Sequence, residues 1–442
     1  MELIVKNSYI KDLNKIALPL IIQSISGQLI GAVDQMMVGR ISSAAIGAIG
    51  TVSSLLYMLS GILGSTSVVL NIRGSKCIGK GDENGFIEEF ISTAILNIIL
   101  GVIVLVSILL FKNIILIYIY GFKGEMLQEA IKYINIMSGS VLVQLLLFNF
   151  AAIFRIKKNT KWILIFSTSS AIINIGLDYL LIFGNFGFPK LGTIGNAIGS
   201  MAALLFNLVA YVIICRKYIK IEYNIIRKYI AKIKQIRIES LPFMGQEILE
   251  GSIFVIAIDA IISRVGADYL SSYKILAQII SILLMPMYMY GSAILTLVSQ
   301  SEGERNIEHL RKIPKVSLML SMTIYLSLAF IVMLFRQNIS MMFTDNPQIV
   351  FNVVKLMLFL LIAHLFNPVS TVFKYSLQAV DESKFVLFGT AIINGVTFII
   401  MIVFIYAFKL SIYGIFISLF LNYFSLYLIY RRRYNNTIRR TF

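Results

Sequence analysis

The chain has 442 residues, of which 58% are apolar and only 14% are charged. Its mean hydropathy of +0.84 excludes a water-soluble fold, whose core could not absorb this much hydrophobic material. The 39 Lys and Arg residues exceed the 22 Asp and Glu residues, but they form short clusters between apolar runs. This pattern is typical of membrane topology signals and excludes nucleic-acid binding. We expect an all-α polytopic membrane protein.

Twelve apolar segments are long enough to cross a bilayer, since a spanning helix needs about 20 mostly apolar residues. They lie near residues 13–38, 46–72, 89–111, 130–154, 161–184, 193–215, 240–262, 270–298, 315–335, 350–377, 384–407 and 410–430. The first residues are polar and carry no small-residue cleavage site, so we expect no removable signal peptide. An even number of spans places both termini on one side.

Basic residues indicate which side holds the termini. Most of them lie at helix ends and loops that face the cytosol if the N-terminus is inside. The exceptions on the outer side are Arg40, Lys112, Lys123, Lys190, Arg264, Arg336 and Lys409. We therefore predict a plasma-membrane protein with cytoplasmic N- and C-termini. Four lysines fall within predicted spans, where we interpret them as side chains that extend to the membrane surface: Lys132, Lys274, Lys355 and Lys374.

A basic segment, residues 216–239, separates six predicted spans from six. We predict an N-terminal lobe over 1–215, a cytosolic linker over 216–239 that forms an amphipathic helix on the membrane surface, and a C-terminal lobe with a basic tail over 240–442.

The two lobes resemble repeats of one another. ALPLIIQ at 17–23 corresponds to SLPFMGQ at 240–246, and AIIN at 171–174 recurs at 391–394. A nearly constant offset across six helices indicates duplication. Because six is even, both lobes insert in the same orientation, so we expect a pseudo-two-fold axis along the membrane normal.

Few acidic residues remain within the spans: Asp34, Asp178, Glu247, Glu250 and Asp259. Asp34 and Asp178 reach a similar depth, and Asn174 lies one helical turn before Asp178 on the same face. Two carboxylates close together in a low dielectric cannot both stay ionised at low cost, so one takes up a proton or a cation neutralises the pair. With an amide oxygen, these oxygens suit Na⁺. We predict a coupling-ion site here, the alternative being a structural polar cluster.

The C-terminal lobe offers different acids. The repeat places Ile258 opposite Asp34 and Phe398 opposite Asp178, so only the N-terminal lobe has the predicted pair, although a slip of one residue would bring Asp259 opposite Asp34. Glu250, near mid-membrane, is either a counter-charge for a cationic ligand or a hydrogen-bond partner of a neighbouring helix. Glu247 lies nearer the cytosol, where we favour a solvated or structural role. For Asp259 we favour a structural role, since it could pair with Arg264 or Lys274.

Nothing in the sequence indicates an enzyme. The chain has no phosphate-binding motif, no metal-ligand spacing of His with carboxylates and no nucleophile with a plausible base. We expect no cofactor, so active transport would be driven by an ion gradient. Pro19 interrupts the span that carries Asp34, and a bend there could link the charge of that acid to the shape of a cavity. A fixed kink is the alternative.

Four motifs make the chain resemble the MATE family, the multidrug and toxic compound extrusion transporters. They are AVDQMMVGRISSAAIGAIG (32–50), NIGLDYLLIFG (174–184), GTIGNAIGS (192–200) and LPFMGQEILE (241–250). The resemblance covers essentially the whole chain. It implies twelve helices in two six-helix lobes and a cation-coupled antiporter that expels organic, often cationic, compounds by alternating between inward- and outward-open states.

The resemblance also implies roles for single residues. Three positions match those that bind the coupling Na⁺ or H⁺ in one branch of the family: Asp34, Asn174 and Asp178. Pro19 matches a proline at which the first helix bends, and Ser200 stands where some members offer a threonine hydroxyl to the ion. Glu250 matches an acid of another branch, although the second acid of that branch, in the tenth span, is missing here.

Two alternatives stay open. A lipid-linked oligosaccharide flippase of the same superfamily shares the architecture but lines its cavity with basic residues, and a passive channel needs no buried acid pair. For the antiporter we expect small organic cations as substrates, with Glu250, Asp34 and Asp178 as contacts. We expect a monomer surrounded by membrane lipid.

Overall fold

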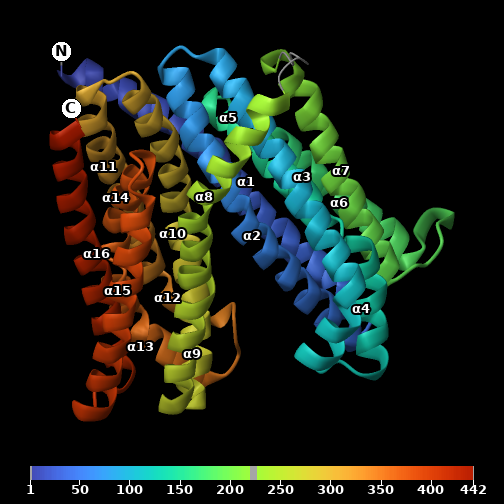
Figure 1. Cartoon of the computed structure of the whole chain (residues 1–442). Helices are drawn as coiled ribbons and strands as arrows, with labels where there is room; N and C mark the ends of the chain where they lie inside the picture. Colours follow the sequence, from blue (N-terminus) through green and yellow to red (C-terminus); the bar gives the residue numbers. More distant parts are fainter. Residues whose placement is uncertain (1, 220–225, 442) are drawn as a thin grey trace. The chain divides into compact units, whose positions relative to one another are not determined.

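The computed structural model describes residues 2–219 and 226–441, which form helices joined by short turns (Figure 1). Residues 220–225 of the predicted linker lie outside the described residues. Ten described helices are long and apolar enough to cross a membrane, and an eleventh span results if the bent pair Gly124–Met137 and Ser140–Ile156 counts as one. The prediction of an all-α multi-span membrane protein is confirmed.

The segment predicted as the seventh span, 240–262, is helical but is not among these ten spans. It runs through α8 (Ile226–Ile248), the π-helical turn η4 (Leu249–Ile253) and α9 (Phe254–Val265). It differs from the other spans in carrying three acidic residues, Glu247, Glu250 and Asp259. Composition therefore identifies ten or eleven spans where we predicted twelve.

The chain divides into two compact units, which we describe separately. The N-terminal unit comprises Leu18–Leu241, and the C-terminal unit comprises Met1–Ala17 with Pro242–Phe442. The first turns of α1 (Glu2–Val38) therefore belong with the C-terminal unit. There the hydroxyl of Tyr290 donates a hydrogen bond to Asn14 Oδ1 at 2.6 Å, and the ring of Tyr9 meets His309 edge to face.

The N-terminal unit contains the later turns of α1, the first part of α8 and the helices between them. These are α2 (Ser43–Gly79), α3 (Glu83–Asn113), η1 (Ile114–Ile119), α4 (Gly124–Met137), α5 (Ser140–Ile156), α6 (Lys161–Phe183), η2 (Asn185–Gly187), α7 (Thr193–Cys215) and η3 (Arg216–Tyr218). Buried apolar side chains of α2, α4 and α5 form its core, including Val52, Ile134 and Leu145. Polar bonds cross this core, since Thr66 donates to Asn97 Oδ1 at 2.6 Å.

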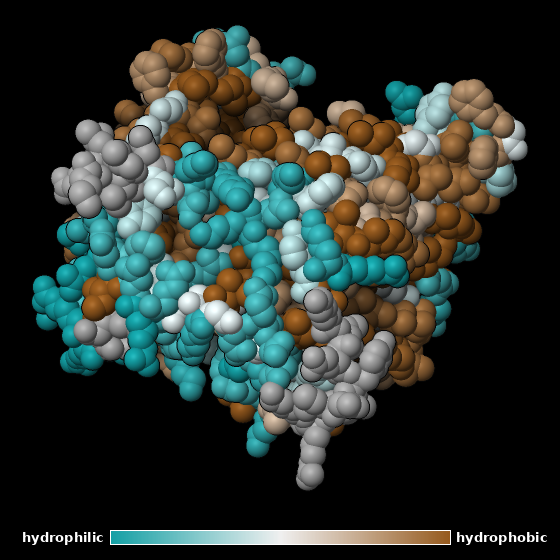
Figure 2. All heavy atoms as spheres, turned by 90° about the horizontal axis from the view of Figure 1, so that it is seen from above, coloured by the Kyte–Doolittle hydropathy of each residue, from teal (hydrophilic) through white to brown (hydrophobic). Residues whose placement is uncertain are grey.

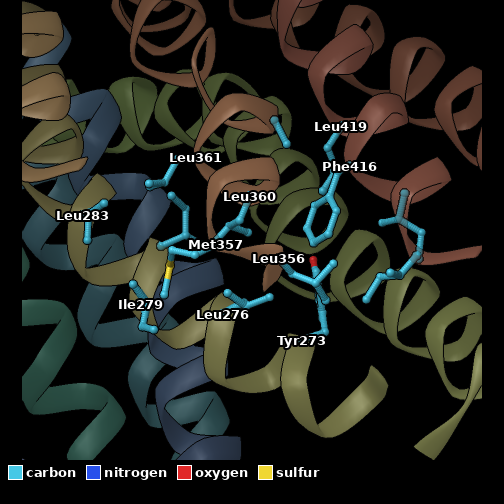
Figure 3. Close-up of a cluster of buried hydrophobic side chains, with 14 of the residues drawn as sticks. Tyr273, Leu276, Ile279, Leu283, Leu356, Met357, Leu360, Leu361, Phe416 and Leu419 are labelled. Carbon is cyan, nitrogen blue, oxygen red and sulfur yellow. The ribbon is translucent and has the colours of Figure 1, made fainter. Parts of the chain in front are cut away.

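The C-terminal unit continues from Pro242. Its remaining helices are α10 (Ala267–Gly303), α11 (Ile307–Leu334), α12 (Arg336–Met341), α13 (Pro347–Ala363), α14 (Asn367–Ala379), α15 (Ser383–Ile402), η5 (Val403–Ala407) and α16 (Ser411–Thr441). Figure 3 shows its core, where side chains of α10, α13 and α16 point toward one another, among them Leu276, Leu360 and Phe416. Burial of this apolar surface holds the three helices together.

An ion-pair network lies at one end of the N-terminal unit. Glu89 of α3 is only 3% exposed and binds Arg73 Nε at 2.7 Å and Lys232 Nζ at 2.9 Å. Arg73 also binds Glu239 at 2.9 Å, so the network ties α8 to α2 and α3. Burial lowers the pKa of Lys232, but hydrogen bonds to Glu89 and Glu88 outweigh that effect and raise it above its ordinary value.

The distribution of hydrophilic and hydrophobic residues along the helices suits a membrane protein. In the view along the helices in Figure 2, hydrophilic side chains gather at the helix ends near the two termini, whereas the neighbouring flanks are mostly hydrophobic. Basic ends on apolar helices are what the sequence predicts for this class of protein.

We expect Glu89→Gln to lower the free energy of unfolding by about 3 kcal/mol, because it removes the buried carboxylate that Arg73 and Lys232 share and leaves them only the more exposed Glu239 and Glu88. The measurement is thermal unfolding of the detergent-purified protein. Glu83→Gln is the control: Glu83 also pairs with a lysine, Lys157, at 2.8 Å, but is 62% exposed, so its loss should cost less than about 1 kcal/mol. Equal losses in the two variants would contradict a structural role for the network.

Candidate functional site

Two polar pairs face each other across the packed helices α6 and α7. Asn174 and Asp178 lie one turn apart on α6, and Asn196 and Ser200 lie one turn apart on α7. The helices run antiparallel from the turn that joins them, which places Asp178 beside Asn196 and Asn174 beside Ser200. Asn196 Nδ2 donates to Asp178 Oδ2 at 3.2 Å, and Asn174 Nδ2 donates to Ser200 Oγ at 3.3 Å. Asn174 also donates to Asp178 Oδ2, at 3.1 Å.

Two glycines on α7 allow this close approach. A Cβ atom on Gly195 would lie 2.6 Å from the backbone of Leu181, and one on Gly199 would lie 2.3 Å from Asp178 Oδ1. Small residues one turn apart are a common device for close packing of membrane helices. Gly199 thus leaves the space that the Asp178 carboxylate occupies.

Asp34 of α1 joins the same site through Asn196. The Asn196 amide donates to Asp34 Oδ1 at 2.7 Å while it also donates to Asp178, so one side chain bridges the two carboxylates. The two carboxylates are close enough to interact directly. We name Asp34, Asn174, Asp178, Asn196 and Ser200 the carboxylate cluster. The structure thus brings together the residues that the sequence placed in one pocket; their role in ion binding stays a prediction.

The carboxylate cluster holds negative charge without a cationic partner. Asp178 is fully buried, and no Lys or Arg of the described residues pairs with it or with Asp34. Asp178 Oδ1 and Asn196 Oδ1 are buried and accept no hydrogen bond from the described residues. Unsatisfied buried acceptors beside two carboxylates need a proton, an ion or water to balance them. The site therefore presents buried oxygen atoms that no group among the described residues satisfies.

Our sequence reasoning missed two residues at this site. Asn196 precedes Ser200 by one helical turn, as Asn174 precedes Asp178, and this repeated spacing was the signal that could have identified it. Tyr133 of α4 bonds Ser53 Oγ at 2.9 Å and lies near both carboxylates. Nothing in the sequence around Tyr133 distinguishes it from other tyrosines in the spans.

The C-terminal unit contains a second polar cluster, in which the acid has a basic partner. Lys374 Nζ of α14 binds Glu250 Oε2 at 2.6 Å. Gln378 donates to Gln246 Oε1 at 2.7 Å, and Gln246 donates to Glu250 Oε1 at 3.0 Å. Our interpretation of Lys374 as a side chain that extends to the membrane surface is wrong, because the carboxylate of Glu250 holds it inside the unit. We name Gln246, Glu250, Lys374 and Gln378 the Glu250 cluster.

A cavity of about 230 Å³ adjoins the Glu250 cluster, lined by both members of the ion pair and by hydroxyl, amide and aromatic side chains. Asn394, which repeats Asn174, lines it and accepts a hydrogen bond from Asn422 at 2.9 Å. The positions that repeat Asp34 and Asp178 are apolar: Ile258 is buried in the hydrophobic core, and Phe398 packs against it. The C-terminal unit therefore has no counterpart of the carboxylate pair at these positions.

The other predicted residues lie outside both clusters. Asp259 forms an ion pair with Lys274, one of the two partners predicted for it. Glu247 is exposed on α8. Pro19 lies within α1, which continues through it as a helix, so the proposed bend stays a prediction. No group of three or more His, Cys, Asp or Glu side chains in the described part of the chain is placed to hold a metal ion.

Comparisons with known proteins agree with this architecture. A family model described as MatE matches residues 19–180 and 242–407, ranges that begin at corresponding points of the repeat. The chain is 25% identical to "Probable multidrug resistance protein NorM" of Thermotoga maritima, over 77% of this chain and 73% of that protein. It is 24% identical to "Multidrug resistance protein MdtK" of Proteus mirabilis, over 87% and 85% of the two chains.

Solved structures show the same fold. One is described as the outward-facing conformation of a multidrug resistance MATE family transporter of the MOP superfamily. It superposes with a TM-score of 0.84 over 98% of this chain and 97% of that chain, at 18% identity. At this identity the likeness establishes the fold alone.

We expect Lys374→Met to lower the free energy of unfolding by about 2 kcal/mol, because the change leaves Glu250, itself partly exposed, without its partner. The double variant Lys374→Met with Glu250→Gln should regain most of that loss, since neither charge then remains. Thermal unfolding in detergent measures both. Lys355→Met, at an exposed position of α13, is the control and should change stability by less than about 0.5 kcal/mol. No recovery in the double variant would show that Lys374 stabilises the unit in another way.

Proposed function

The chain belongs to the MATE family of multidrug efflux transporters, and on that premise we propose that it is a secondary active antiporter. In this proposal it exports organic, amphipathic cations in exchange for Na⁺ or H⁺ by alternating access. The chain belongs to a family of transporters and not of enzymes. The observation that carries the proposal is the pair of carboxylates bridged by Asn196, with no basic partner among the described residues.

Exchange follows from the charge of the carboxylate cluster. A small cation or proton and the cationic group of a substrate would bind the same carboxylate oxygens of Asp34 and Asp178. Two positive charges held side by side at one small site in a low dielectric repel each other, so the two would not bind together. Competition for the same carboxylates would therefore release one cation when the other binds. A carrier that alternates between the two sides of the membrane then couples the two fluxes.

The atoms of the carboxylate cluster suit either ion. For H⁺, one proton shared between the two carboxylates removes the repulsion between them. For Na⁺, the carboxylate oxygens, Asn196 Oδ1 and the Ser200 hydroxyl are oxygen ligands of the kind that hard cations prefer. Asn174 would hold Asp178 in place in both cases, through the hydrogen bond at 3.1 Å.

Glu250 has a more restricted role in this proposal. Lys374 already neutralises it, so a cationic substrate would gain from Glu250 only by displacing the lysine. We therefore assign the main recognition of positive charge to Asp34 and Asp178. Glu250 contributes to substrate binding as part of the polar wall of the cavity beside it.

Pro19 and the membrane orientation complete the proposal. Proline removes one backbone hydrogen bond from α1, the helix that also carries Asp34. We propose that neutralisation of Asp34 changes the bend of α1 at Pro19. The distribution of basic residues supports cytoplasmic N- and C-termini, and we propose that the chain acts as a monomer in the plasma membrane.

The alternative functions receive less support. A flippase for lipid-linked oligosaccharides needs basic side chains for a diphosphate, whereas the carboxylate cluster is acidic and Lys374 is paired with Glu250. A passive channel gives no reason for buried carboxylates that lack a partner. The antiporter accounts for both clusters.

We expect Asp34→Asn to abolish the gradient-driven efflux of a cationic dye from cells while expression stays normal, because the change removes the charge that both ions share. Asp259→Asn is the control: Asp259 also lies in a helix of the membrane region, but is paired with Lys274, and efflux should stay within about twofold of wild type. Efflux is measured as loss of dye fluorescence from loaded cells. Unchanged efflux in Asp34→Asn would contradict coupling through this acid.

We also expect Gly199→Ala to impair efflux, because the new methyl group would displace the Asp178 carboxylate from its position 2.3 Å away. Gly176→Ala on the neighbouring helix α6 is the matched control, since its Cβ would meet no atom within 4 Å. The same dye assay checks both variants at equal expression. Equal activity of the two would show that the position of Asp178 is not critical.

A further inference from the structure

A cavity of about 480 Å³ opens at one end of the C-terminal unit, away from the two clusters described above. It lies between the first turns of α11 and the last turns of α16, with α14 behind it. None of the residues that line it also lines the cavity beside Glu250. It therefore takes no part in the proposed transport site.

Four basic side chains surround this cavity. Arg311 and Lys315 lie one turn apart on α11, and Arg431 and Arg439 lie two turns apart on α16. All four are exposed, and no Asp or Glu is among the residues that line the cavity. The site therefore attracts an anion and has no internal carboxylate to compete with it.

The carboxylates nearby bind other cations. Glu382 pairs with Arg433 at 2.8 Å, and Glu308 pairs with Lys312 at 2.5 Å. Neither of these basic residues lines the cavity. Glu302 does not line the cavity either. The positive charge of the four lining residues is thus left for a ligand.

The back wall of the cavity is aromatic. The centroid of the Phe373 ring lies 6.1 Å from the centroid of the Tyr427 ring and 6.2 Å from that of the Tyr434 ring. Tyr434 is held in place because its hydroxyl donates to the backbone oxygen of Leu310 at 2.7 Å. Arg431 donates to the hydroxyl of Tyr427 and lies over its ring. A ligand here would meet positive charge at the opening and apolar surface inside.

The position along both helices matches the surface of a membrane. On α16 the apolar run ends at Tyr430 and three arginines follow; on α11 the basic turns end at Lys315 and the apolar run begins at Val316. The cavity thus lies where both helices pass from apolar to basic, at the level of lipid headgroups. Basic pockets between spanning helices at this level are suited to anionic lipids.

We propose that this cavity binds the headgroup of an anionic phospholipid. The phosphodiester would accept hydrogen bonds from the arginines and Lys315, and the glycerol and first acyl carbons would cover Phe373 and Tyr427. Free phosphate offers the same charge but leaves the aromatic wall exposed to water, so the cavity favours the lipid. This inference does not depend on the coupling ion or on the transported compound.

The test is a lipid titration of the detergent-purified full chain by native mass spectrometry. Phosphatidylglycerol is the anionic probe, phosphatidylethanolamine is the zwitterionic one, and inorganic phosphate is added as a competitor. The test variant is Arg431→Gln with Arg439→Gln. The control is Arg432→Gln with Arg440→Gln, which removes the same charge from the same helix at residues that do not line the cavity.

We expect phosphatidylglycerol to bind wild type and the control equally, and to bind the test variant at least about tenfold more weakly. Lys315→Gln, a single exposed change on α11, should also weaken binding and gives an independent test if the double variant folds poorly. Equal binding to all variants would show general attraction to positive charge and overturn the proposal. So would phosphatidylethanolamine bound as tightly as phosphatidylglycerol, or displacement of the lipid by an equal concentration of phosphate.

Discussion

The antiparallel packing of α6 against α7 is the constraint on which the candidate site depends. Gly195 and Gly199 let the two helices approach closely, and the register then places Asp178 beside Asn196. The amide of Asn196 is thereby aimed at a second carboxylate, Asp34, which it binds at 2.7 Å. Each of these polar groups would be costly in a lipid environment by itself. Together they form a site in which one amide bridges two carboxylates that have no basic partner among the described residues.

The two units hold acidic side chains within the helix bundle in different ways. In both, two polar residues four positions apart on one helical segment face two on an antiparallel neighbour. In the C-terminal unit the acid, Glu250, finds its cation within the chain, at Lys374. In the N-terminal unit Asp34 and Asp178 have no such partner among the described residues. That difference explains why we place ion exchange in the N-terminal unit, while a polar but internally neutralised cavity remains in the other.

Much of this arrangement could be predicted from the sequence. Asp34 and Asp178 were conspicuous because charges are rare in apolar segments, and helical periodicity added Asn174. Asn196 was missed because its role depends on the register between α6 and α7, which no local pattern reports. Lys374 was misinterpreted because it lies near the end of a span, where long side chains usually reach water; only the three-dimensional fold reveals the acid beside it. The spans were easily found, except where acids interrupt the segment 240–262.

Coupling between ion and substrate is tested most directly with purified protein in liposomes. Accumulation of a cationic dye is measured under an imposed Na⁺ gradient, an imposed H⁺ gradient, and no gradient. Exchange through the carboxylate cluster predicts that one of the two gradients drives accumulation by the wild-type protein, and that the same gradient has no effect on Asp178→Asn. Accumulation that is equal without a gradient, or that persists in Asp178→Asn, would contradict it.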